Sequence, residues 1–200
     1  MGRNDLQGEA SGVSALNRMR SRAVLILALF LAALAGPRQP TRAQDARPTE
    51  YQLKAAFLFN FAKFVEWPDS AFPAPTAPFV IGVLGNNPFR DDLARTVRDK
   101  TIDAHPLLVQ EYRSAARATN CHLLFISNSE RKSIPDIIQG LRGRSILTVS
   151  EVDHFTEAGG MINFVLQGTK IRFQINKEAA VSAGLKISSK LMSLAVPTGG

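Results

Sequence analysis

Cysteine is almost absent from this chain, whose 200 residues include only Cys121. A disulfide needs two cysteines, so no bridge can form within one chain, even in an oxidising compartment. Cys121 begins an apolar run that extends to Ile126. We therefore expect a buried structural thiol at this position, with a bridge between two chains as the alternative.

Signatures of catalytic, cofactor and metal sites are also missing. The chain lacks the phosphate-binding motifs GxGxxG and GxxxxGKS/T and the nucleophile motif GxSxG. His105, His122 and His154 are scattered among different predicted elements, which argues against a metal site. His122, beside the apolar run, is expected to be a hydrogen-bonded packing residue. We therefore expect no enzyme activity, no catalytic residue, no metal and no cofactor.

Adjacent acidic residues are rare in the chain, and Asp91 and Asp92 are the pair that resembles an acid–base site. On a helix, adjacent side chains diverge by about 100°. Both residues stand where a helix is expected to begin, and acidic side chains stabilise a first helical turn. We interpret them as helix-starting residues.

The net positive charge of the chain is concentrated near its N-terminus. The chain has 24 basic and 17 acidic residues, a net charge of +7. Residues 1–43 hold six of the bases and two of the acids, which leaves 18 against 15, or +3, with the signs interspersed. A nucleic-acid interface needs a clustered basic patch. We therefore expect no nucleic-acid partner.

Long apolar runs are limited to one segment near the N-terminus. Thirteen apolar residues at 23–35 follow a basic stretch. This run is short for a membrane span, which needs about 20 residues, and it is typical of a secretory signal peptide. Cleavage is expected after Ala35 or Ala43, and Met19 is an alternative start. An uncleaved anchor is the other interpretation.

The domain organisation follows from this signal. Residues 1–43 are expected to be an N-terminal extension and cleaved signal peptide, and residues 44–200 a single α/β domain in the periplasm, not inserted in the membrane. Apolar runs predict strands, and amphipathic stretches between them predict helices. Strands are expected at 79–84, 107–112, 123–126 and 146–150, helices at 89–98 and 133–141, a hairpin at 161–166 and 171–175, and a last helix from 177 to 194. This alternation predicts a three-layer sandwich: a mostly parallel central sheet with a C-terminal antiparallel hairpin and helices on both faces.

Aromatic residues make up only 8% of the chain, yet six fall among the seventeen residues 51–67. Helical periodicity places most of them on one face, which we expect to be core. The predicted core face consists of Leu53, Phe57, Phe61, Phe64, Val65 and Trp67. Phe59 instead falls on the opposite face with Lys63 and Glu66. Aromatic side chains exposed among polar ones are typical of protein interfaces, so we expect Phe59, Lys63 and Glu66 to bind a partner.

A turn after the first predicted strand offers a second candidate site. Gly85, Asn86 and Asn87 link the carboxyl end of this strand to a helix, where free backbone N–H groups can bind an anion. Pro88, which follows, lacks one such donor. A small-ligand site and an ordinary turn are both consistent with this sequence.

Three stretches of the expected domain resemble the YfiR family of periplasmic regulators. They are residues 54–68, residues 159–165 with 170–176, and residues 183–191. The resemblance implies a compact α/β sandwich that often dimerises and that represses an inner-membrane diguanylate cyclase, restraining cyclic-di-GMP signalling and biofilm formation. The expected partners are thus such a cyclase or another membrane receptor, and a second copy of the chain. A periplasmic small-ligand sensor acting on a different receptor or kinase is the alternative. The lone Cys121 departs from the disulfides of the family's best-known member, so redox control within one chain is not expected.

Overall fold

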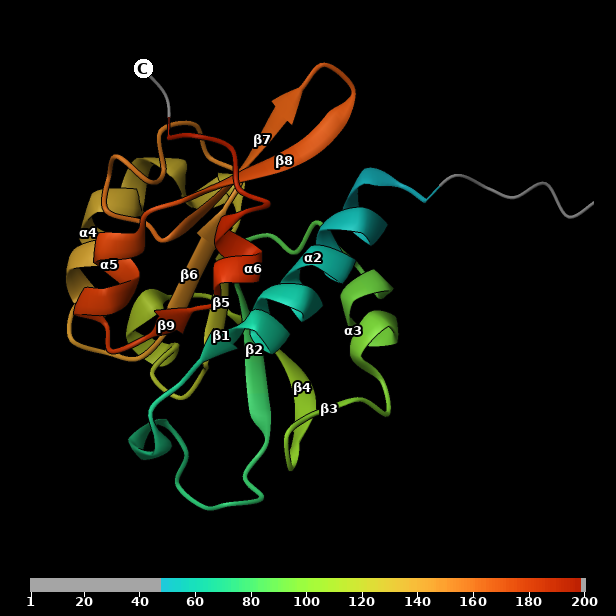
Figure 1. The fold of residues 1–200 in the computed structure, drawn as a ribbon, viewed down its shortest axis with the longest axis vertical. Coiled ribbons are helices and arrows are strands. Elements are labelled where there is room, and N and C mark those ends of the chain that lie inside the picture. The colour runs from blue at the N-terminus through green and yellow to red at the C-terminus, as the bar shows by residue number, and fades with distance from the viewer. Residues whose placement is uncertain (1–47, 199–200) are drawn as a thin grey trace, which may run out of the picture. The chain divides into compact units, whose positions relative to one another are not determined.

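A seven-stranded sheet organises the domain in the computed structural model, which describes residues 48–198 (Figure 1). The expected signal peptide lies outside these residues. The strand order is β3-β4-β2-β5-β6-β7-β8. The five inner strands are parallel, and both edge strands run antiparallel to their neighbours. The strands are β2 (Phe79–Leu84), β3 (Thr101–Ile102), β4 (His105–Tyr112), β5 (Leu123–Ile126), β6 (Leu147–Ser150), β7 (Ile162–Gln167) and β8 (Lys170–Ile175).

Helices cover both faces of this sheet, which confirms the predicted three-layer sandwich. Residues alternate along β2, so that Ile81 joins one apolar core and Val80 the other. The first core includes Phe61 of α2, and the second includes Ile137 of α4. The α-helices are α2 (Glu50–Phe64), α3 (Asp92–Val97), α4 (Ile134–Leu141), α5 (Lys177–Ser182) and α6 (Ser189–Met192), and short 3₁₀ helices lie at Asp69–Ala71, Ala115–Arg117 and Asn128–Ser133.

The aromatic helix α2 is shorter than predicted. Thr49 caps its N-terminus, and Gln52 completes a capping box. The helix ends at Phe64 and not at Trp67, because Val65 adopts an extended conformation (φ −115°, ψ 140°). Val65–Glu66 forms strand β1, which pairs with β9 (Lys186–Ile187). Glu66 therefore lies on a strand and not on the helix.

The last predicted helix is in fact two short helices separated by β9. Helix α5 ends at Ser182, and Gly184 follows with φ +74°, a conformation that glycine adopts at little cost. Strand β9 then pairs with β1, and Ser188 caps α6 by accepting a hydrogen bond from the Leu191 amide. Helix α3 also begins later than predicted, at Asp92, after Arg90 with φ +50°.

Candidate interaction site at the end of helix α2

The buried face of α2 differs from the predicted core face. Phe61 is fully buried, with its ring centroid 5.0 Å from that of Phe173. Leu53 was expected in the core but is 41% exposed, and Lys54 beside it is only 4% exposed. The prediction for Leu53 is wrong because the helix turns Lys54, rather than Leu53, toward the sheet.

Phe59 is half-buried at the edge of the core and not fully exposed. Two lysine side chains lie over its ring: Lys100 Nζ is 4.4 Å from the ring centroid and Lys63 Nζ is 5.7 Å from it. Such cation–π contacts at exposed sites contribute about 0.5–1 kcal/mol each. Lys190 Nζ lies in the same way 5.1 Å from the ring centroid of Phe64.

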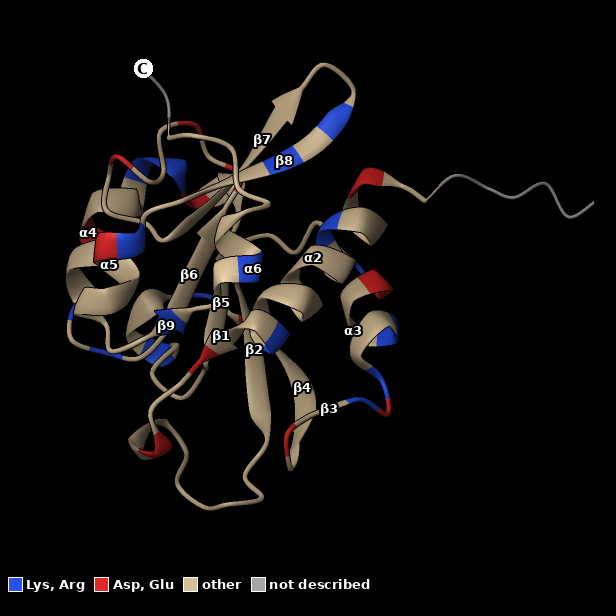
Figure 2. Cartoon of the chain, viewed as in Figure 1, with Lys and Arg blue, Asp and Glu red and all other residues tan. Residues whose placement is uncertain are grey.

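Lys63 and Glu66 are both exposed and line one groove of about 480 Å³, although they belong to different elements. Half-buried aromatic side chains of Trp67 and Phe72 line the same groove. Figure 2 shows blue at the C-terminal end of α2 and red beside β1. The structure thus brings Lys63 close to both Phe59 and Glu66, and we call these three residues with Trp67 and Phe72 the α2-end surface.

Stacked side-chain rings support the wall of the groove at Phe72 and His105. The Phe72 ring stacks on His105 at 3.9 Å between centroids and on His122 at 4.4 Å. His122 Nδ1 accepts a hydrogen bond from the Val80 amide at 3.0 Å. Its Nε2 therefore carries the proton and donates to the Ala71 carbonyl at 3.2 Å. Burial lowers the pKa of His122, which keeps the ring neutral, and the prediction of a hydrogen-bonded packing residue is confirmed.

The predicted structural thiol is also confirmed. Cys121 is 4% exposed, and its thiol donates to the Ala118 carbonyl at 3.3 Å. Burial raises the pKa of Cys121 to about 12. A thiol of this kind is almost entirely protonated near neutral pH and reacts slowly.

The turn at Gly85, Asn86 and Asn87 uses its polar groups within the chain. The Gly85 amide donates to the Tyr112 carbonyl at 3.1 Å, and the Asn86 amide donates to Ser129 Oγ at 3.0 Å. Asn87 Nδ2 donates to a carboxylate, that of Glu111, at 2.6 Å. A ligand site at this turn stays a prediction, and the engaged amides and the nearby carboxylate do not favour an anion there.

Sequence reasoning missed an ionic cluster around Lys54. Its Nζ lies 2.5 Å from Glu50 Oε1 and 2.5 Å from Glu151 Oε2, and the Tyr51 hydroxyl donates to Glu151 at 3.2 Å. Burial opposes the charge of Lys54, but the hydrogen bonds to both carboxylates outweigh it and raise its pKa. The Glu50–Lys54 spacing of four was a visible signal. No sequence feature near Lys54 indicated that Glu151 would pair with it.

This cluster lines a polar cavity of about 770 Å³ at the carboxyl ends of β5 and β6. The exposed pair His154 and Glu157 lies nearby in sequence, with 2.9 Å between His154 Nδ1 and Glu157 Oε1. Residues 48–198 contain no group of three side chains suited to hold a metal ion. Their helices are also all too short or too polar to cross a membrane.

The fold and this surface define the class of protein: an α/β sandwich with an aromatic surface that carries charges of both signs beside a groove. Within that class, the chain belongs to the YfiR/HmsC-like family, whose model matches residues 51–196. At the level of the family this means a periplasmic regulator in the diguanylate cyclase pathway, and a regulator rather than an enzyme.

Proposed function

We propose that this protein is exported to the periplasm, where it binds an inner-membrane diguanylate cyclase and holds it inactive. The α2-end surface makes the contact, with Phe59, Lys63 and Glu66 as its principal residues. Repression comes from binding energy alone, and release of the partner is the signal.

The observation that carries this proposal is that Lys63 and Glu66 line one exposed groove and that Lys63 also lies over the ring of Phe59. Lys63 forms no ion pair with any residue in the described part of the chain, and neither does Glu66. Aromatic side chains beside unpaired charges are typical of protein interfaces, where the charges select the partner and the rings supply apolar contact. Family membership supplies the pathway.

A deletion strain tests the function. Loss of the gene is expected to raise cyclic-di-GMP, and the wild-type gene restores the original level. The Phe59→Glu and Lys63→Glu variants are expected to fail in this restoration, because each places a negative charge on the contact surface. Leu108→Glu is the matched control, since Leu108 is 52% exposed on β4 and lies outside the α2-end surface. Unchanged cyclic-di-GMP in the deletion strain would contradict a cyclase partner and favour another receptor or kinase.

A direct binding measurement completes the test. The protein is used as bait on solubilised inner membranes, and the captured membrane protein is identified with wild type, with Lys63→Glu and with Leu108→Glu. Circular dichroism of each variant checks that the fold persists. The family resemblance also implies a homodimer, which sedimentation equilibrium of the purified protein measures; a monomer at all concentrations would contradict it.

A further inference from the structure

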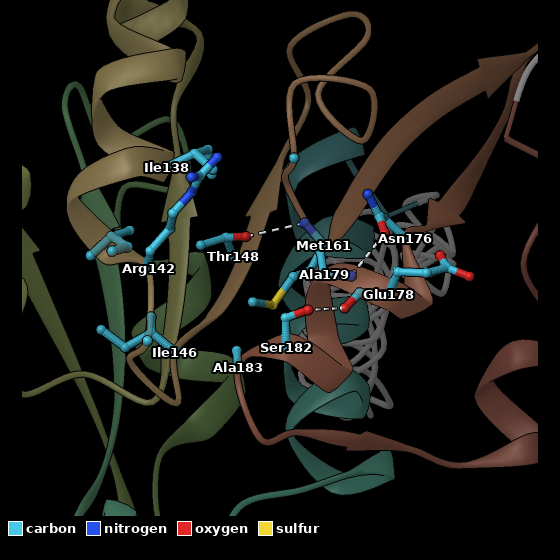
Figure 3. A pocket seen from close by; sticks show the side chains of 13 residues that line it. Ile138, Arg142, Ile146, Thr148, Met161, Asn176, Glu178, Ala179, Ser182 and Ala183 are labelled. Atoms are coloured by element: carbon cyan, nitrogen blue, oxygen red, sulfur yellow. Dashed lines mark hydrogen bonds between the residues drawn. The ribbon is translucent and has the colours of Figure 1, made fainter.

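A cavity of about 470 Å³ lies between helices α4 and α5 (Figure 3). Small-molecule sites in proteins have volumes of about 300–1,000 Å³ and mostly apolar walls. The walls here are largely apolar, contributed by Ile138, Leu141, Ile146, Met161, Ala179 and Ala183. Ala179 of α5 and Ala183, the residue that caps the C-terminus of α5, are four positions apart, and their small side chains leave the space open.

One buried hydroxyl in this cavity has hydrogen-bonding capacity to spare. Thr148 is 2% exposed, and its Oγ1 accepts a hydrogen bond from the Met161 amide at 3.1 Å. The hydroxyl hydrogen has no acceptor among the described residues. Asn176, in contrast, is hydrogen-bonded through both of its side-chain polar atoms: its Oδ1 accepts from the Ala179 amide at 2.9 Å, and its Nδ2 donates to the Thr156 carbonyl at 3.0 Å.

A basic side chain lies at the rim of the cavity. Arg142, just after the end of α4, is exposed and forms no ion pair with residues 48–198. Glu178 is the carboxylate on the opposite wall, and Figure 3 shows its side chain pointing away from Arg142. The rim therefore presents an unpaired guanidinium, which is the side chain best suited to bind a carboxylate.

We propose that this cavity binds a small amphiphilic carboxylate. Its carboxylate pairs with Arg142 and accepts the spare hydrogen bond from Thr148. Its apolar chain packs against Met161, Ala179 and Ala183.

The cavity is linked to the α2-end surface through the backbone. Three residues separate the end of α5 from β9, whose residues pair with Val65 and Glu66 of β1. The Ser188 amide also donates to the Phe64 carbonyl at 2.9 Å. A ligand that separates α5 from α4 thus shifts the strand that positions Glu66, and binding at the cavity regulates the partner. This regulatory step rests on the proposed function, whereas binding at the cavity does not.

Calorimetric titration of the purified protein with octanoate tests the site. Octanoate is expected to bind the wild type, and Arg142→Ala is expected to weaken binding at least about tenfold, the loss of one charge-assisted contact. Arg144→Ala removes an exposed cation two residues away that does not line the cavity, and it leaves binding unchanged. Ala179→Leu fills the cavity and abolishes binding while the protein stays folded.

1-Octanol separates the contribution of the head group from that of the chain. It binds the wild type more weakly than octanoate, and it binds Arg142→Ala and wild type equally. Octanoate that fails to bind the wild type, or that binds equally to Arg142→Ala and Arg144→Ala, would overturn the proposed site.

Trp67, the single tryptophan, follows β1 directly and reports on the link. Saturating octanoate is expected to change its fluorescence emission with the same midpoint as the calorimetric binding, and Ala179→Leu removes this change. Octanoate binding without a change in Trp67 fluorescence would overturn the proposed link between the cavity and β1. Both measurements use the isolated protein, so their failure leaves repression of the cyclase untouched, and unchanged cyclic-di-GMP in the deletion strain leaves the cavity proposal untouched.

Discussion

Lys54 of helix α2 pairs with Glu151, 97 positions further along the chain and directly after β6. The side chains are 5% and 14% exposed, and 2.5 Å separates Nζ from Oε2. This pair attaches the N-terminal half of α2 to the end of the central sheet. The α2-end surface lies at the other end of the same helix, so this attachment helps to fix its position.

Replacing Lys54 is expected to destabilise the domain strongly. Lys54→Met keeps most of the apolar stem but leaves Glu151 without its cation in a largely buried position, a loss of about 3 kcal/mol in the free energy of unfolding. Glu50→Gln is the control, because the Glu50 side chain is 47% exposed and such pairs contribute at most about 1 kcal/mol. Urea unfolding measures both. Equal losses for the two variants would contradict a special role for the Lys54–Glu151 pair.

His122 is expected to make the protein less stable in mild acid. Burial lowers its pKa from the usual 6.5, and His105 nearby acts in the same direction. Below pH 6.5 the unfolded chain binds a proton at this position that the native state still excludes, so the free energy of unfolding falls as the pH falls from 6.5 toward the native pKa. Proton NMR titration of the three histidines checks this, and an imidazolium at His122 already formed at pH 6.5 would contradict it.

Two glycines are expected to respond in opposite ways to substitution by alanine. A Cβ at Gly160 would lie 2.2 Å from the ring of Phe155, which is fully buried, so Gly160→Ala is expected to cost about 3 kcal/mol. A Cβ at Gly140, on α4, meets nothing within 4 Å. Gly140→Ala is expected to stabilise by about 0.5 kcal/mol, because alanine is the better helix former. Thermal unfolding distinguishes them, and two changes of the same sign would disprove the packing argument.

Cys121 is expected to resist modification in the native protein. Its thiol is buried with a pKa of about 12, so little thiolate is available for reaction. Iodoacetamide at pH 7.5 should label the native protein far more slowly than the urea-unfolded protein, as mass spectrometry measures. Non-reducing electrophoresis should show no covalent dimer. Rapid native labelling, or a covalent dimer, would favour the alternative of a bridge between two chains.

The bounds of two central strands, both buried on both faces, could be predicted from the sequence. Phe79–Leu84 and Leu123–Ile126 have the predicted bounds, because continuous apolar runs of this length are typical of inner parallel strands. The hairpin was predicted from two apolar segments, 161–166 and 171–175, on either side of a short polar turn, and its strands are Ile162–Gln167 and Lys170–Ile175. The ends of helices were predicted less well. Val65–Glu66 continues the helical pattern of α2 but pairs with Lys186–Ile187, and that pairing cannot be read from either segment alone.

The amino-acid sequence by itself determined the parallel sandwich, the buried Cys121 and the hydrogen-bonded His122, since each depends on local apolar pattern. Helical periodicity in the sequence also selected Phe59, Lys63 and Glu66 as candidate partner-binding residues. Only the tertiary structure decided that Lys63 and Glu66 share a groove, that Lys54 is buried while Leu53 is exposed, and that a cavity separates α4 from α5. These features depend on contacts between segments far apart in the chain, where the orientation of an element is set by the surfaces against which it packs.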